Sequence, residues 1–365
     1  MDTCKIAVFN APNDPIKIEE VPLPELGPGE ILVKNEYTTL CRSDINIFSG
    51  KRKEKTPTIL GHEVAGRIAA LSQGSPKMDL RGRFLRVGDR ITWATYVSEP
   101  ESELADSGIP QRGTGLFKYG YEKITPKNTL HGGLGEYMLL RANTPVVKVE
   151  ESVPAPLVAI INCVVATVAA AMRVAGRIHG KNVVISGAGM LGAIACAMAK
   201  TEGAAQVVAI DADEDRRKKA LDFGADTTLP SSADGAALLK ALEAVYPQGL
   251  HIHKVLEFSG VAEAMESTLS LLGEGGSAVW VGATYPQRNL QLSAELLVRN
   301  LYSIKGIHHY SREDFLRAIQ FMEHHHRDFP FLDMVHDQFT LPEVNEAFAY
   351  ALEHNPFRVG VRISS

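Results

Sequence analysis

Short apolar or alternating segments dominate roughly the first 150 residues of the chain. KIAVFN and EILVKNEYTTL run apolar or alternate with polar positions, and the turn sequence ELGPGE lies between them. VAGRIAAL, VGDRITWATYV and EYMLLRAN continue this pattern, and Gly-Asp or glycine-rich turns end these segments. Because short alternating runs bounded by turns are typical of strands, the pattern predicts a mainly β region.

Near residue 155 the pattern changes to alternating helices and strands. LVAIINCVVATVAAAMRVAG has helical length and is rich in small apolar residues. Beyond it, strand-like segments such as KNVVISG and AQVVAID are separated by helical ones such as MLGAIACAMAKTEG. The end of the chain adds an amphipathic helix, REDFLRAIQFMEHHH, and a strand, RVGVRI. This alternation predicts an α/β fold with a doubly wound parallel sheet.

Composition narrows the functional class without changing this fold. A chain of 365 residues exceeds the usual size of one hydrophobic core, so two domains are expected. The net charge of −5 argues against a nucleic-acid-binding surface. The most apolar run, residues 158–171, is interrupted by Asn162 and is interpreted as too short to span a membrane. With no signal peptide visible at the start, we expect a cytoplasmic protein.

A glycine-rich loop follows a predicted strand and opens a predicted helix. Its sequence is Gly187-Ala188-Gly189-Met190-Leu191-Gly192. The first glycine permits a tight turn, the second lets a pyrophosphate approach the backbone, and the third allows close packing of strand and helix. The helix N-terminus then offers N–H groups to the phosphates. We therefore expect a dinucleotide cofactor at residues 187–192.

Asp211 ends the next predicted strand, 19 positions after Gly192. A carboxylate there can accept hydrogen bonds from the adenosine ribose hydroxyls and repel a 2′-phosphate, which favours NAD over NADP. Capping of the following helix is an alternative role that is compatible with this one. The nearby Arg216 and Arg217 leave NADP open.

The chain has four cysteines, Cys4, Cys41, Cys163 and Cys196, too few and too scattered for a disulfide framework. Cys4 and Cys196 are interpreted as packing residues on a strand and a helix. Cys41 opens the sequence CRSD, and His62, 21 positions later, stands beside Glu63 in the sequence GHEVAG.

CRSD, GHE, Cys163 and the glycine fingerprint, taken in this order, resemble the zinc-dependent medium-chain alcohol dehydrogenases. VGDRI, GGLGEY and EFSG extend the resemblance over nearly the whole chain. It implies a mostly β, GroES-like catalytic domain over residues 1–164 and 307–365. It also implies a Rossmann cofactor domain over residues 165–306.

The same resemblance implies that Cys41, His62 and Cys163 bind a catalytic zinc. Two thiolates and an imidazole suit zinc, and three protein ligands leave one position open. Glu63 is implied to lie beside the metal, and Asp44 to orient the histidine ligand.

Further roles follow from matching positions in the family. Ser43 corresponds to the hydroxyl that bridges substrate and solvent, and Arg42 and Arg358 to residues that approach the cofactor pyrophosphate. The implied reaction is hydride transfer between an alcohol, or its carbonyl, and NAD. Asn46 replaces the histidine that ends the proton relay in the family, and an amide cannot titrate.

The polar loop over about residues 96–130 departs from the pattern of many relatives, which bind a structural zinc there through four cysteines. The matching positions are Glu99, Ser102, Ala105 and Gly113. None provides a thiolate, so we expect one zinc per chain and no structural zinc. The loop must be held by packing and hydrogen bonds or be mobile, and its Gly, Ser and Glu content predicts mobility around residues 98–116, with order returning near LFKYGYE.

The sequence is compatible with two classes of substrate. GIPQRGTGLFKYGYE and IKGIHHY resemble a subgroup associated with phosphonate metabolism, and a pocket cation such as Lys118 would suit a hydroxyalkylphosphonate. A polyol is the alternative. A zinc-free quinone or enone reductase and a non-catalytic dinucleotide-binding protein are the competing functions. The expected partner is a small-molecule alcohol or carbonyl, and the expected assembly is a homodimer or homotetramer, without nucleic acid or membrane.

Overall fold

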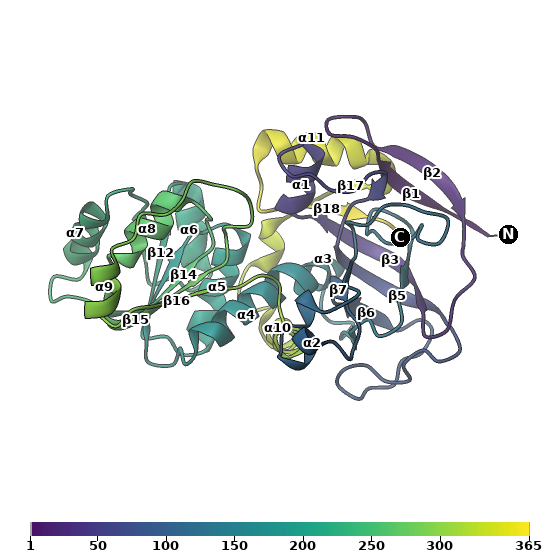
Figure 1. Cartoon of the computed structure of the whole chain (residues 1–365). Coiled ribbons are helices and arrows are strands. Elements are labelled where there is room, and N and C mark those ends of the chain that lie inside the picture. The colour runs from purple at the N-terminus through teal and green to yellow at the C-terminus, as the bar shows by residue number, and fades with distance from the viewer. Residues whose placement is uncertain (1, 365) are drawn as a thin grey trace. The chain divides into compact units, whose positions relative to one another are not determined.

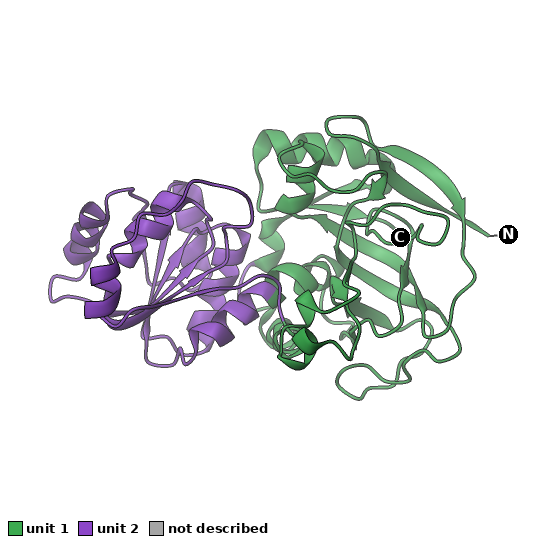
Figure 2. Ribbon diagram, viewed as in Figure 1, with its two compact units in different colours: residues 1–166, 311–327, 331–365 green, residues 167–310, 328–330 purple. Residues whose placement is uncertain are grey.

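The computed structural model describes residues 2–364, which divide into two compact units (Figures 1 and 2). Unit 1 comprises residues up to 166 together with 311–327 and 331 onward, and unit 2 comprises 167–310 and 328–330. The divisions expected after residues 164 and 306 lie near these boundaries. The return of residues 328–330 to unit 2 was not expected from the sequence.

Unit 1 is built mainly from strands, as predicted. Its largest sheet has the order β10–β6–β5–β3–β18–β17, with β9 also paired with β3, and smaller sheets join β2–β1–β4 and β7–β8. The strands of the largest sheet are β10 (Val146–Lys148), β6 (Arg90–Trp93), β5 (Glu63–Leu71), β3 (Ile31–Leu40), β18 (Arg358–Arg362), β17 (Val335–Thr340) and β9 (Tyr137–Leu140). Those of the smaller sheets are β1 (Thr3–Phe9), β2 (Lys17–Pro22), β4 (Thr58–Ile59), β7 (Tyr96–Val97) and β8 (Phe117–Lys118).

Strand β3 forms the centre of unit 1 because both of its faces are buried. Ile31 and Val33 pack in one apolar cluster, whereas Leu32 and Leu40 pack in another. Alternate residues of a strand point to opposite faces, so β3 supplies side chains to both clusters. This explains why the consecutive residues Ile31, Leu32 and Val33 are all apolar.

Helices and short helical turns connect and cover these strands. They are α1 (Arg42–Phe48), α2 (Glu103–Asp106), η1 (Pro110–Arg112), α3 (Ala155–Ile160), the π-helix η2 (Ile161–Val165), α10 (Arg312–His325), η3 (Phe331–Met334), η4 (Leu341–Glu343) and α11 (Val344–His354). The α3–η2 segment continues into α4 (Ala166–Ala175) as one helical run.

This run corrects one expectation from the sequence. Ala155–Ala175 has 21 residues and a hydropathy of 2.2, so by length and composition it could cross a membrane. However, 78% of its apolar window is buried inside the structure, as in the core helix of a globular protein. The expectation that the segment is too short was wrong, because the helix continues beyond the apolar run on both sides.

Unit 2 contains a six-stranded parallel sheet in the order β13–β12–β11–β14–β15–β16. The strands are β11 (Asn182–Ser186), β12 (Gln206–Asp211), β13 (Thr227–Pro230), β14 (Ile252–Glu257), β15 (Leu272–Trp280) and β16 (Ser303–Gly306). The helices between them are α5 (Met190–Thr201), α6 (Glu214–Asp222), α7 (Gly235–Val245), α8 (Ala262–Leu269) and α9 (Ala294–Arg299). This strand order is the doubly wound dinucleotide-binding arrangement, which confirms the predicted fold class.

The cysteine-free loop around residues 98–116 has local structure of its own. Ser102 caps α2 by accepting a hydrogen bond from the Ala105 N–H at 3.1 Å, and the Glu99 N–H donates to the Thr114 carbonyl at 2.9 Å. A Cβ added to Gly113 would lie 2.6 Å from the Ser102 hydroxyl, so these two positions are in close contact. Packing and hydrogen bonds therefore connect the parts of this loop, and the mobility expected for residues 98–116 stays a prediction.

His131 is a buried histidine whose environment predicts a pH-dependent stability. Its side chain is fully buried, and neither ring nitrogen has a hydrogen-bond partner among the described residues. Burial lowers its pKa from 6.5 to about 4. A histidine with a lowered pKa in the folded state takes up its proton more readily when unfolded. Stability is thus fully present above about pH 6.5 and falls as the pH drops toward 4.

We expect His131 to lower the free energy of unfolding by up to about 3 kcal/mol as the pH drops from 6.5 to 4, since one pKa unit corresponds to about 1.4 kcal/mol. Urea unfolding at pH 7.5, 6.0 and 4.5 measures the effect. The variant His131→Leu should lose less stability than the wild type over this range. Equal losses in both proteins would show that His131 does not cause the pH dependence.

Candidate metal and cofactor sites

The register of three strands brings distant residues to one end of the large sheet. Strand β3 pairs antiparallel with β5, which places Thr39 opposite Glu63, and with β18, which places Leu40 opposite Val359. Cys41 directly follows β3, whereas β5 begins at Glu63 and β18 begins at Arg358. The three residues therefore meet although more than 300 positions separate the first from the last.

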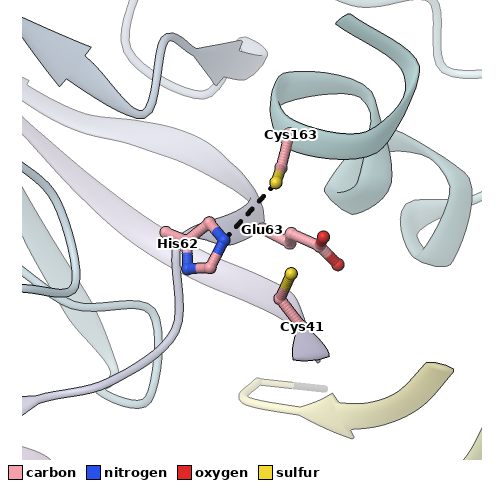
Figure 3. A group of neighbouring side chains, drawn as sticks. All are labelled: Cys41, His62, Glu63 and Cys163. Atoms are coloured by element: carbon pink, nitrogen blue, oxygen red, sulfur yellow. Dashed lines mark hydrogen bonds between the residues drawn. The ribbon is translucent and has the colours of Figure 1, made fainter. Parts of the chain in front are cut away.

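Four potential metal donors converge at this end of the sheet (Figure 3). The ligand atoms of Cys41, His62, Glu63 and Cys163 all lie within 4.8 Å of one another. Cys163 comes from the π-helix η2, and its Sγ lies 3.4 Å from Nε2 of His62. Among the residues that the structure describes, this is the one cluster of three or more such donors.

The geometry of the cluster suits a tetrahedral zinc. Zn–S and Zn–N bonds of about 2.3 and 2.05 Å at a tetrahedral angle imply a sulfur–nitrogen separation of about 3.6 Å. The observed 3.4 Å between Cys163 and His62 is close to this value. His62 is only 3% exposed, and the donor set of two thiols and one imidazole is the set that zinc prefers.

The pKa values of the two thiols are shifted in opposite directions. A hydrogen bond from Cys163 lowers the pKa of Cys41 well below its ordinary value, and the positive charge of Arg358 adds to this against the effect of burial. The hydrogen bond to Cys41, together with burial, raises the pKa of Cys163. A thiolate at Cys41 is thus favoured, which prepares the cluster for a cation.

Glu63 is held by a buried ion pair with Arg358. The guanidinium donates from Nε to Oε2 at 2.9 Å and from Nη2 to Oε1 at 3.1 Å. It also lies 3.7 Å from the Cys41 sulfur. Burial raises the pKa of Glu63 to about 7, and the charge of Arg358 opposes this shift.

The position of Arg358 bears on the role expected for it. The sequence resemblance implied a contact with the cofactor pyrophosphate, whereas the structure shows its guanidinium engaged with Glu63 and Cys41 and only 5% of the residue exposed. The pyrophosphate contact stays a prediction. Its link to the metal donors was not foreseen.

The fully buried carboxylate of Asp44 contacts both His62 and the backbone of Cys41. It accepts hydrogen bonds from the N–H groups of Cys41 at 2.9 Å and Gly61 at 3.2 Å, and its Oδ1 lies 3.4 Å from Nδ1 of His62. Burial disfavours the charged imidazole, but Asp44 outweighs this effect and raises the pKa of His62. With Nδ1 facing Asp44, Nε2 is directed at the other donors.

Ser43 and Tyr121 form a hydroxyl pair beside this histidine. Their oxygens lie 2.9 Å apart, and the Tyr121 oxygen lies 3.2 Å from Nδ1 and 3.5 Å from Nε2 of His62. Sequence reasoning proposed Ser43 but missed Tyr121, because nothing in KYGYE indicates which residue it will meet. Arg42, also proposed from the sequence, hydrogen-bonds Asn355 at the end of α11.

The glycine loop lies in unit 2 between β11 and α5, as predicted. Gly187 has φ of +88°, and a Cβ there would lie 2.6 Å from the Ser259 nitrogen. A Cβ at Gly192 would lie 1.8 Å from the Gly187 carbonyl oxygen, so no larger residue fits. Gly189 meets only Nη1 of Arg216, at 3.5 Å, which leaves this side of the loop accessible to a ligand. Met190 and Leu191 form the first turn of α5, a 12-residue helix.

Asp211 ends β12 and contacts the same loop. Its Oδ2 accepts a hydrogen bond from the Ala188 N–H at 2.7 Å, and its Oδ1 accepts one from the Asp213 N–H at 2.9 Å. The N-cap of α6 is Asp213, so the interpretation of Asp211 as that cap was wrong. Each Asp211 oxygen retains a lone pair for a ribose hydroxyl. Arg217 donates to the backbone carbonyls of Asp211 and Ala212.

Together, a doubly wound sheet with a glycine loop and a thiol–imidazole donor cluster define a metal-binding dehydrogenase. The chain belongs to the zinc-dependent medium-chain alcohol dehydrogenase family. The family profile for the alcohol dehydrogenase GroES-like domain matches residues 27–151, and the profile for zinc-binding dehydrogenases matches residues 191–324. The protein is therefore a zinc-type alcohol or polyol dehydrogenase, and the resemblance seen in the sequence is confirmed.

Several proteins are similar over most of the chain. An alcohol dehydrogenase from Geobacillus stearothermophilus is 30% identical over 321 residues, covering 87% of this chain and 88% of the relative. Sorbitol dehydrogenase from Rattus norvegicus is 28% identical over 315 residues, covering 83% of this chain and 81% of the relative. The crystal structure of an alcohol dehydrogenase from Thermotoga maritima matches with a TM-score of 0.91 and 27% identity, covering 99% of this chain and 100% of the other.

The Glu63–Arg358 ion pair gives a stability prediction. Arg358→Met leaves the Glu63 carboxylate buried without its cation, and loss of one partner of a buried pair typically costs about 3–5 kcal/mol. The double variant Glu63→Gln/Arg358→Met should recover part of this loss, since no buried charge is then left unpaired.

Urea unfolding in the presence of a chelator separates this effect from metal binding. Arg299→Met is a suitable control, because its ion pair with Glu295 is exposed and should contribute little. The single variants Arg358→Met and Glu63→Gln are measured alongside. If the stability lost in the double variant equals the sum of the losses in the two single variants, the two residues do not stabilise the fold as a pair.

Proposed function

We propose that this protein is a zinc-dependent dehydrogenase that transfers a hydride between an alcohol, or its carbonyl, and NAD. The convergence of Cys41, His62 and Cys163, with Glu63 beside them, supports this proposal most directly. These residues fit a catalytic zinc, and Gly187, Gly189, Met190, Leu191, Gly192 and Asp211 fit a dinucleotide. The presence of the donor cluster disfavours the zinc-free reductase. Zinc supplies Lewis acidity when bound, and NAD supplies a hydride acceptor.

The residues around the donors then have distinct tasks. Asp44 fixes the imidazole ring, so that Nε2 of His62 remains available as a ligand. Arg358 balances the charge of Glu63 and of a Cys41 thiolate. To Ser43, whose Oγ lies 2.9 Å from the Tyr121 oxygen, we assign a hydrogen bond to the substrate oxygen that orients this oxygen for reaction. We retain a pyrophosphate contact for Arg42 and Arg358 as part of the proposal.

For the substrate, we propose a hydroxyalkylphosphonate or a polyol. Lys118 is half-buried. Its pKa is lowered mainly by burial and, to a smaller extent, by the charges of Arg112 and Arg52. Arg112 and Arg52 therefore act on this residue together with the carboxylates of Glu54 and Glu122, and we propose the cations of this group as contacts for an anionic substrate. The similarity to sorbitol dehydrogenase supports a polyol instead. We further propose a cytoplasmic homodimer or homotetramer, since the edge strand β16 could extend the sheet to a second chain.

The zinc assignment predicts the behaviour of ligand variants. Purified without added metal, the wild type should hold about one zinc per chain, because the 98–116 loop has no thiolates. Cys41→Ser, His62→Ala and Cys163→Ser should lose the zinc and turnover but retain NAD binding, since the glycine loop belongs to the other unit. Elemental analysis, NAD titration and turnover with a panel of polyols and 2-hydroxyalkylphosphonates provide the measurements.

The variant Cys4→Ala is the matched control, because it removes a buried thiol of unit 1 outside the donor cluster. It should keep both zinc and activity. A metal-depleted ligand variant with near wild-type turnover would contradict the assignment, as would a second tightly held zinc in the wild type.

Asp211 predicts the choice of cofactor. Asp211→Ala removes both the ribose acceptor and the repulsion of a 2′-phosphate, so NAD should bind more weakly and NADP relatively better. We expect the ratio of kcat/KM values to move toward NADP by at least tenfold, or about 1.4 kcal/mol. Asp213→Ala is the control, because its carboxylate caps α6 and should not alter the ratio. A wild type that already prefers NADP would refute this role for Asp211.

A further inference from the structure

Tyr121 is fixed against the metal donors by the backbone that precedes it. The segment from Lys118 to Tyr121 forms a turn in which the Tyr121 N–H faces the Lys118 carbonyl at 3.4 Å. Gly120 has φ of +80°, and a Cβ at this position would lie 2.7 Å from the Gly61 carbonyl oxygen. This close backbone approach places the Tyr121 ring beside His62, with ring centroids 5.1 Å apart.

A cation lies over the same ring. The Arg52 guanidinium lies 4.9 Å from the Tyr121 ring centroid, and Arg52 is itself held by Glu54 through hydrogen bonds of 2.9 and 2.6 Å. A cation over an aromatic face is attracted to the ring electrons. Tyr121 is 7% exposed, so the ring is confined and its hydroxyl has a fixed location.

The hydroxyl of Ser43 depends on Tyr121 for its direction. Over residues 2–364, Tyr121 is the one hydrogen-bond partner seen for Ser43 Oγ, at 2.9 Å. Each hydroxyl has a single hydrogen, so one of the two groups donates and the other keeps its hydrogen for another acceptor. Nδ1 of His62 faces Asp44 at 3.4 Å and carries its hydrogen there, so it does not accept from the Tyr121 hydroxyl, and Ser43 Oγ is left as the acceptor. The pair is therefore polarised from Tyr121 toward Ser43.

We propose that Tyr121 is a positioning residue for Ser43: its hydroxyl donates to Ser43 Oγ and leaves the hydrogen of Ser43 free to point at the substrate oxygen. This inference rests on the proposed function, in which Ser43 contacts that oxygen. Neither the family profiles nor the sequence motifs assign a role to Tyr121. The hydroxyl of Tyr121 also lies 3.2 Å from Nδ1 of His62, but in this proposal its effect on the reaction is exerted through Ser43, so removal of either hydroxyl should remove the same contribution.

A double-mutant cycle tests this dependence in the zinc-loaded protein. Tyr121→Phe keeps the ring and its contact with Arg52 but deletes the hydroxyl. We expect kcat to fall about tenfold, the effect of one hydrogen bond, while NAD affinity and zinc content stay unchanged. In the Ser43→Ala background, Tyr121→Phe should change kcat by less than twofold.

A binding measurement provides a second readout that does not require turnover. The affinity of the NAD-bound protein for trifluoroethanol, an unreactive alcohol, is measured by calorimetry for the same four proteins. Tyr121→Phe should weaken binding severalfold in the wild-type background and have no further effect in Ser43→Ala. Tyr119→Phe is the control, since its buried hydroxyl bonds Thr144 at 2.6 Å and should leave both measurements unchanged.

Additive losses from Tyr121→Phe and Ser43→Ala, or an unchanged Tyr121→Phe variant, would overturn the inference while leaving the proposed function intact. Absence of wild-type turnover with every alcohol would instead defeat the proposed function. In that case the cycle of trifluoroethanol affinities still decides whether Tyr121 acts through Ser43. Melting temperatures of all variants show whether a loss reflects unfolding.

Discussion

The antiparallel register of β3 with β5 and β18 is the constraint on which the metal site depends. It places Cys41, Glu63 and Arg358 at one end of the sheet, and His62 immediately precedes β5. A shift of one residue in either pairing would turn every side chain of that strand to the opposite face. Such a shift would also exchange the side chains that β3 supplies to the two apolar clusters, which are packed on its opposite faces. The packing of the core and the geometry of the donors are thus fixed by the same pairing.

The charges in this region are only partly balanced within the protein. Asp44 and Glu63 are fully buried carboxylates, and a thiolate at Cys41 adds a further negative charge. Arg358 and the backbone N–H groups that bond Asp44 offset part of this charge. Burial of unpaired charges is costly, so the remaining negative charge favours a divalent cation among the donors. A cation at the proposed metal site would therefore also stabilise the fold electrostatically.

Cofactor binding depends on a different kind of constraint. At Gly187 and Gly192 the backbone itself comes so close to other atoms that no Cβ fits, whereas Gly189 is open on the ligand side. Asp211 joins the end of β12 to this loop through the Ala188 N–H. These contacts lie within unit 2, and the metal donors lie within unit 1. Loss of one function by substitution therefore need not disturb the structure that carries the other.

The sequence by itself determined the features that are local along the chain. Alternation predicted the strands of unit 1 and the parallel sheet of unit 2, and the glycine spacing predicted the loop, because each reflects the geometry of a few consecutive residues. Motif order pointed to Cys41, His62 and Cys163, and their convergence agrees with it. Only the tertiary structure paired Arg358 with Glu63 and Tyr121 with Ser43. These contacts join residues 295 and 78 positions apart and arise from strand register and a tight turn, neither of which has a signature in the sequence.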